Sequence, residues 1–120
     1  MRNRDQIRAK NALDALRKYN HFKGVKGGDP LTGFPALIIG NGLLSAIAFC
    51  KKSKGGWLDI CNAIATHLGD SEIGLLPGGV NVDGMLEYLI KEDSGSLRLC
   101  TEEAIAYLNY LRRFAKADNN

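Results

Sequence analysis

Apolar residues fall at helical spacing from near the start of the chain. They form one apolar stripe on a helix, and its members are Ala9, Ala12, Leu13, Leu16 and Tyr19. Asn3 is a suitable N-cap, and Gln6 three residues later can complete a capping box. The pattern therefore predicts a first helix from about Asp5 to Phe22. The glycines that follow predict a flexible loop over residues 24–33.

The apolar segment 37–52, LIIGNGLLSAIAFCKK, is compatible at first sight with three structures. A strand that enters a dinucleotide-binding turn would need a third glycine and a βαβ context, which the surrounding sequence lacks. A membrane span would need about 20 apolar residues, whereas this run is shorter and contains Asn41. A helix that starts near Pro35 and is surrounded by other helices explains the whole segment.

Gly40 and Gly42 lie inside this expected helix. Glycine costs a helix about 1 kcal/mol relative to alanine, so we expect another helix to cross close to one of them. Replacing Gly42 by leucine should then destabilise the fold through overpacking. Lys51, Lys52 and Lys54 end the helix, where cations suit the negative end of its dipole.

Two further helices are predicted before residue 92. The first runs from Trp57 to Leu68 and is ended by Gly69. The second follows a loop over 70–80, with Asn81 or Asp83 as its N-cap. Its expected apolar face consists of Val82, Met85, Leu86, Leu89 and Ile90.

The last predicted helix begins at Thr101, after a turn over 93–96. Thr101 would be its N-cap, and Glu102 and Glu103 would occupy the first turn, where the helix dipole favours acidic residues. Its expected buried face consists of Ala104, Tyr107, Leu108, Leu111, Phe114 and Ala115. We therefore predict an all-α fold: one domain over residues 1–120, a compact bundle of about five helices with a buried central helix and frayed ends at about 1–3 and 117–120.

The composition fits this prediction without adding a function. The 120 residues are 45% hydrophobic and 24% charged, which suffices for one core. No signal peptide is visible, because the first residues are polar and basic, so we expect a cytoplasmic protein. Three widely spaced cysteines, Cys50, Cys61 and Cys100, are expected to be reduced and packed as small hydrophobic residues.

Catalytic and metal-binding motifs are not recognisable. His21 and His67 fall on different predicted helices without a cysteine or carboxylate at ligand spacing, so we interpret them as surface or packed residues. Asp83 and Glu87 are one helical turn apart and are interpreted as part of a solvated acidic face. No P-loop is present and no cofactor is expected. A catalytic triad depends on geometry, however, so a small enzyme stays an alternative.

Charge favours nucleic-acid binding. Residues 1–30 carry eight lysines and arginines against three aspartates, whereas residues 70–93 carry six acidic residues and one lysine. Such asymmetry indicates a surface that faces a polyanion, an acidic surface that faces a partner, or both. Without a zinc finger or RNP motif, contact would be to the phosphate backbone and largely independent of sequence.

Four segments, taken in order, resemble a known family. QIRA at 6–9 opens the first helix, NGLL at 41–44 lies in the apolar segment, and TEEAI at 101–105 precedes YLRRFA at 110–115. Their order and spacing cover nearly the whole chain. They resemble the small helical subunit of type III-B CRISPR–Cas effector complexes, the Cmr complexes. Residues 69–96 are the least characteristic part.

This resemblance implies a non-catalytic structural subunit of an RNA-guided antiviral complex. Several copies would stack head to tail as a minor filament, beside the backbone subunits that bind the crRNA, and would help hold the crRNA–target RNA duplex. Target cleavage would belong to the backbone subunits, and DNase and cyclic oligoadenylate activities to the large subunit. The expected partners are these subunits, copies of the chain itself, crRNA and target RNA, and no membrane.

In that setting the charged residues divide into two candidate sets. Candidate contacts to the RNA backbone are Arg4, Arg8, Lys18, Lys51, Lys52, Lys54, Arg112 and Arg113. Arg112 or Arg113 can instead pair with Glu102, with Glu103 or with a neighbouring subunit. Candidate residues for subunit stacking are Asp70, Glu72, Asp83, Glu87, Glu92 and Asp93, because opposite charges favour head-to-tail contact. A free-standing helical regulator that binds nucleic acid is the alternative function.

Overall fold

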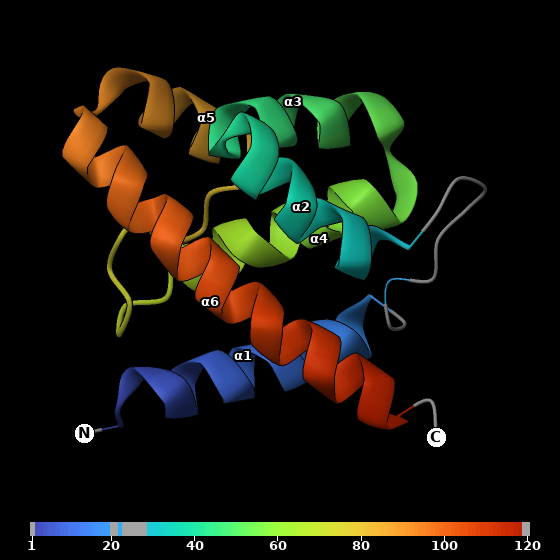
Figure 1. Cartoon of the computed structure of the whole chain (residues 1–120). Coiled ribbons are helices and arrows are strands. Elements are labelled where there is room, and N and C mark those ends of the chain that lie inside the picture. Colours follow the sequence, from blue (N-terminus) through green and yellow to red (C-terminus); the bar gives the residue numbers. More distant parts are fainter. Residues whose placement is uncertain (1, 20–21, 23–28, 119–120) are drawn as a thin grey trace.

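The computed structural model describes residues 2–19, 22 and 29–118 (Figure 1). Within those ranges it contains six helices and no strand, which confirms the all-α prediction. The helices are α1 (Arg4–Lys18), α2 (Pro30–Asn41), α3 (Leu43–Ser53), α4 (Gly55–Leu68), α5 (Val82–Lys91) and α6 (Ser94–Asp118). The sequence predicted five, and the sixth arises because one expected helix is divided in two.

Every helix contributes to one hydrophobic core. α6 runs diagonally across the bundle in Figure 1 and contacts α1, α2 and α4. Fully buried side chains from the six helices include Leu16, Phe34, Ile47, Ile60, Met85 and Leu108. Each such side chain stabilises the fold by about 1.5–3 kcal/mol relative to an exposed one.

The central helix is α4 and not the segment that was expected. α4 contacts each of the other five helices, and eight of its 14 residues are buried. The segment 37–52 instead leaves several apolar side chains in water, among them Ile39 at 74% exposure and Phe49 at 42%. A buried central helix is therefore present, but it is α4 and not the apolar segment 37–52. Neighbouring helices cover only one side of 37–52, so its other apolar side chains stay exposed.

The first helix begins as predicted. The amide of Gln6 donates to Asn3 Oδ1 at 2.9 Å, and the amide of Asn3 donates to Gln6 Oε1 at 2.8 Å, so both halves of the capping box are formed. The helix ends at Lys18, earlier than predicted. Phe22 is buried but has a φ of 55°, so the backbone has already turned there.

The second helix starts earlier than predicted. Asp29 is its N-cap and accepts from the amide of Leu31 at 3.0 Å, and Pro30 occupies the first helical position. The expected loop over 24–33 is therefore wrong at its end, while residues 24–28 lie outside the described residues. Pro35 lies inside α2 and not at its start. Having no N–H, it cannot bond to the carbonyl of Leu31.

α2 and α3 meet at Gly42, where a single continuous helix was expected. Gly42 has a φ of 88°, a conformation that favours glycine. A Cβ at Gly40 or Gly42 would meet no other atom within 4 Å, so the expected crossing helix is absent at both positions. Asn41 between them is exposed. The glycine at 42 is needed for the backbone bend, and a larger residue there would be strained and not overpacked.

Two further boundaries refine the sequence prediction. Asn81 caps α5 by accepting from the amide of Gly84 at 3.0 Å, as expected, although Ile90 is 63% exposed and not part of the buried face. α6 begins at Ser94 and not at Thr101. Asp93 Oδ1 accepts from the amide of Ser96 at 2.8 Å. Asp93, and not Thr101, therefore caps the start of this helix.

The three cysteines are buried and free, which confirms that they pack as small hydrophobic residues. Contact with Cys50 and burial raise the pKa of the Cys61 thiol. No described helix has both the length and the apolar character that a membrane crossing requires.

Candidate nucleic-acid interface and the Glu103 cluster

Three helices converge on one buried carboxylate, Glu103 of α6, which is 3% exposed. Arg8 of α1 makes two bonds to it, from Nε to Oε2 and from Nη2 to Oε1, both at 2.7 Å. Arg4 of α1 donates to Oε1 at 2.9 Å, and His67 Nε2 of α4 lies 2.9 Å from Oε2. We call these four residues, Arg4, Arg8, His67 and Glu103, the Glu103 cluster.

A second layer of polar groups fixes the histidine of this cluster. The amide nitrogen of Asn11 lies 2.9 Å from His67 Nδ1 and donates to Asp70 Oδ2 at 3.0 Å. An amide nitrogen can only donate, so Nδ1 accepts and the proton of a neutral imidazole is on Nε2, which donates to Glu103. The imidazole also stacks on Tyr107, with ring centroids 4.1 Å apart. His67 was interpreted from the sequence as a surface or packed residue, and it is packed. His21 lies outside the described residues.

The cluster keeps Glu103 ionised. Burial opposes the charged form, but hydrogen bonds from Arg8, His67 and Arg4 outweigh it and hold the pKa of Glu103 well below its usual range. The same contact raises the pKa of Arg8. This paired carboxylate contributes to folding, because removing one partner of a buried ion pair leaves an uncompensated charge.

The predicted RNA-binding arginines therefore differ in exposure. The side chain of Arg8 is 20% exposed and that of Arg4 is 50% exposed, and both face Glu103. Arg112 and Arg113 are exposed on α6. Neither pairs with the two glutamates suggested by the sequence, because within the described residues Glu103 binds α1 and His67, and Glu102 lies 3.5 Å from Arg98.

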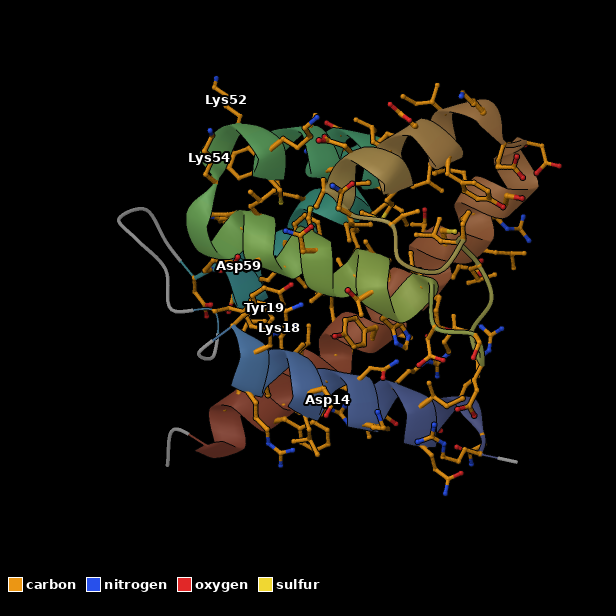
Figure 2. The ribbon with its side chains drawn as sticks, turned by 180° about the vertical axis from the view of Figure 1, so that it is seen from behind. Asp14, Lys18, Tyr19, Lys52, Lys54 and Asp59 are labelled. Atoms are coloured by element: carbon orange, nitrogen blue, oxygen red, sulfur yellow. The ribbon has the colours of Figure 1, made fainter. Side chains whose placement is uncertain are left out.

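The lysines at positions 51, 52 and 54 lie where α3 ends and α4 begins. Lys52 and Lys54 are exposed, and Figure 2 shows them on the same side of the molecule as Lys18, the last residue of α1. We call Lys18, Lys52 and Lys54 the basic edge. Lys51 points elsewhere and pairs with Asp83 of α5. Lys18 Nζ lies 5.3 Å from the ring centroid of its neighbour Tyr19.

The acidic segment 70–93 is partly paired with basic residues elsewhere in the fold. Glu72 pairs with Arg2, and Asp83 pairs with Lys51. Burial opposes ionisation of Asp70, but hydrogen bonds from the amide of Glu72 and from Asn11 hold its pKa below the usual range. Of the other candidates, Asp93 caps α6, and Glu87 and Glu92 are exposed. Part of the charge asymmetry in the sequence is thus neutralised within the fold.

A comparison with protein families finds a match for this chain. The model of the CRISPR-associated protein family Cas_Cmr5 matches residues 4–118, nearly the whole chain. The chain belongs to the Cas_Cmr5 family. This confirms the resemblance found in the sequence. No curated protein and no solved structure gives a significant match.

Membership has direct consequences for function. Cmr5 is the small, non-catalytic subunit of the type III-B CRISPR Cmr complex. This Cmr5 chain is accordingly a component of that effector complex and associates with its other subunits. Within the described residues, no group of three His, Cys, Asp or Glu side chains could hold a metal ion.

Sequence reasoning missed the Glu103 cluster, although one signal was available. Glu103 directly precedes the apolar face of α6, at a position that helical spacing turns toward α1. A carboxylate at the border of a buried stripe needs a hydrogen-bonded or charged partner. The first helix, which is rich in arginine and lysine, was a candidate source of that partner. The pairing itself needed the crossing of α1 and α6, which no local pattern in the sequence records.

Proposed function

We propose that this Cmr5 chain stacks in several copies as a minor filament of the Cmr complex and helps hold the crRNA–target RNA duplex through its phosphate backbone. The observation that carries the proposal is the basic edge, whose lysines are exposed and lie on one side of the molecule (Figure 2). Such cations neutralise phosphates and release counterions without reading bases. The complex would act in the cytoplasm.

Exposure and ion pairing support an order among the proposed RNA contacts. Lys18, Lys52 and Lys54 are the primary contacts, with the exposed Arg112 and Arg113 of α6 as a second patch. Arg8 and Lys51 contribute less, since Glu103 and Asp83 already neutralise them. Arg4 is intermediate, because half of its side chain is exposed despite its bond to Glu103.

The test reverses charge at the α3–α4 turn. In the reconstituted complex, Lys52→Glu/Lys54→Glu should weaken target-RNA binding and reduce the dependence of log K on log salt by roughly one to two units. The matched control is Lys91→Glu/Arg98→Glu, the same charge change on α5 and α6. An unchanged salt slope in the first variant would contradict the assignment.

The stacking part of the proposal rests on the exposed acidic residues Glu87 and Glu92. Each copy would place them near the basic edge of the next, a heterologous contact that can repeat without closing. Glu87→Lys/Glu92→Lys should reduce assembly measured by sedimentation. Mixing this variant with Lys52→Glu/Lys54→Glu should partly restore it, because the charges are exchanged. Absence of any rescue would count against this contact.

A further inference from the structure

Two exposed apolar side chains lie one helical turn from an exposed charge. Phe49 of α3 is 42% exposed and precedes Lys52 by three positions, and Ile90 of α5 is 63% exposed and follows Glu87 by three positions. Residues three apart are neighbours on the surface of a helix. We call Phe49 and Lys52 the α3 pair, and Glu87 and Ile90 the α5 pair. One pair joins an apolar side chain to a cation and the other joins one to an anion.

The other large apolar side chains that are exposed on the described residues lack such a charge. Ile39 lies within residues 30–50, a stretch of the sequence without a charged residue. Leu99 precedes Glu102 by three positions, but Arg98 already lies 3.5 Å from that carboxylate. Complementary combinations of apolar surface and charge are therefore found, within the described part of the chain, in the α3 pair and the α5 pair.

The ring of Phe49 is held in place by the chain itself. It packs edge to face with Trp57 of α4, with ring centroids 5.0 Å apart and ring planes at 80°. Trp57 in turn packs against the hydrophobic core. An ordered side chain loses less conformational entropy on binding, and aromatic residues are enriched in protein interfaces. Phe49 is thus well suited to anchor a protein contact.

The α3 pair and the α5 pair lie toward opposite ends of the helical bundle. α5 begins beside α3, where Asp83 pairs with Lys51, and then runs away from it. Figures 1 and 2 both show the end of α3 and the end of α5 on opposite sides of the molecule. One copy can therefore offer its α3 pair to the α5 pair of the next copy, and this contact can repeat without closing.

We propose that the α3 pair of one copy of this chain binds the α5 pair of the next, with Phe49 against Ile90 and Lys52 against Glu87. Charge complementarity selects a second copy as the occupant, because a charge buried beside an apolar contact needs an opposite charge. The chain supplies both halves of this contact. The inference rests on the proposed stacking, which names charged residues alone, and it adds the apolar side chains that anchor the stack.

The first test is a cross-link in the reconstituted Cmr complex. One chain carries Phe49→Cys and the other Ile90→Cys, and diamide oxidises two adjacent thiols to a disulfide while it is itself reduced. The mixture should give a covalent dimer on a non-reducing gel, whereas the native cysteines are buried and should not react. The matched control mixes Phe49→Cys with Ile39→Cys. A dimer no stronger than in this control would overturn the proposal.

The second test measures what the apolar side chains contribute. The concentration of the chain that half-saturates the reconstituted complex should rise about tenfold for Phe49→Ala and for Ile90→Ala, but not for Ile39→Ala. Ile90→Ala decides the result if Phe49→Ala disturbs the contact with Trp57. Both substitutions remove the same contact, so the double variant should also show a rise of about tenfold. A rise of roughly a hundredfold would mean two independent effects and would overturn the direct contact.

Failure of this inference and failure of the proposed stacking give different results. If the cross-link is absent while Lys52→Glu/Lys54→Glu still restores assembly of Glu87→Lys/Glu92→Lys, the charged contact stands and the apolar anchors are wrong. If the cross-link forms without that rescue, the apolar contact is supported and the charged contact is rejected. If both are absent, neither proposal holds.

Discussion

Two groups of basic residues that look alike in the sequence have different surroundings in the fold. Arg4 and Arg8 of α1 face a buried carboxylate, whereas Lys52 and Lys54 at the α3–α4 turn are exposed. The first group holds α1 to α6 and the second remains available to a partner. A count of positive charge therefore predicts an electrostatic surface only after the partners inside the fold have been found.

The largest effect is expected from removing the shared partner of the first group. Glu103→Ala leaves Arg8 without its buried carboxylate and should lower the free energy of unfolding by about 3–5 kcal/mol. Its exposed neighbour provides the control: Glu102→Ala should change stability by less than about 0.5 kcal/mol. Urea unfolding measures both. Equal effects of the two substitutions would mean that the Glu103 cluster does not stabilise the chain.

The pH dependence of stability should show the same contrast. The pKa of Glu103 is lowered in the folded chain: burial opposes this shift, but Arg8, His67 and Arg4 outweigh it. The carboxylate thus contributes its stability above an unfolded glutamate pKa of about 4.3. That contribution is lost as pH falls, so the urea midpoint should decrease between about pH 5 and pH 2. Glu103→Gln cannot titrate and should show a shallower decrease, and parallel curves would contradict the assignment.

Substitutions at two exposed glycines, Gly40 and Gly42, should change the free energy of unfolding by smaller amounts and in opposite directions. Gly42→Leu should cost about 1–2 kcal/mol, because a φ of 88° strains any L side chain. Gly40 lies inside α2 with open space around it, so Gly40→Ala should stabilise the chain by up to about 1 kcal/mol. Thermal unfolding of the two variants checks the signs. A stable Gly42→Leu would show that the turn can adopt another conformation.

The smallest effect on stability is expected at the basic edge. Lys52→Glu/Lys54→Glu should change the free energy of unfolding by less than about 0.5 kcal/mol, because both side chains are exposed. The variant that matters most for RNA binding should thus matter least for folding. A large loss of stability would instead give these lysines a structural role and weaken the contrast with the Glu103 cluster.

The sequence by itself determined the helical class, the family and the starts of α1 and α5. Asn3 and Asn81 could be recognised as N-caps from the sequence, because each accepts a hydrogen bond from an amide three residues later. Such a bond depends only on neighbouring residues. Thr101 was wrongly predicted to be an N-cap. It lies inside α6, where its hydroxyl donates to the carbonyl of Leu97 in the preceding turn at 2.7 Å. The bend at Gly42 was missed, because a glycine can mark either a close approach or a positive φ.

Tertiary structure alone decided which charges are available. The bonds from Arg8 and His67 to Glu103 join residues 95 and 36 positions apart, and α1 and α4, which contact each other, are also separated by a long stretch of chain. Helical periodicity records which face of a helix is buried, but it carries no information on which helix covers that face. Electrostatic pairing and cavity shape depend on that second choice, and so the candidate sites emerged only once the helices were packed together.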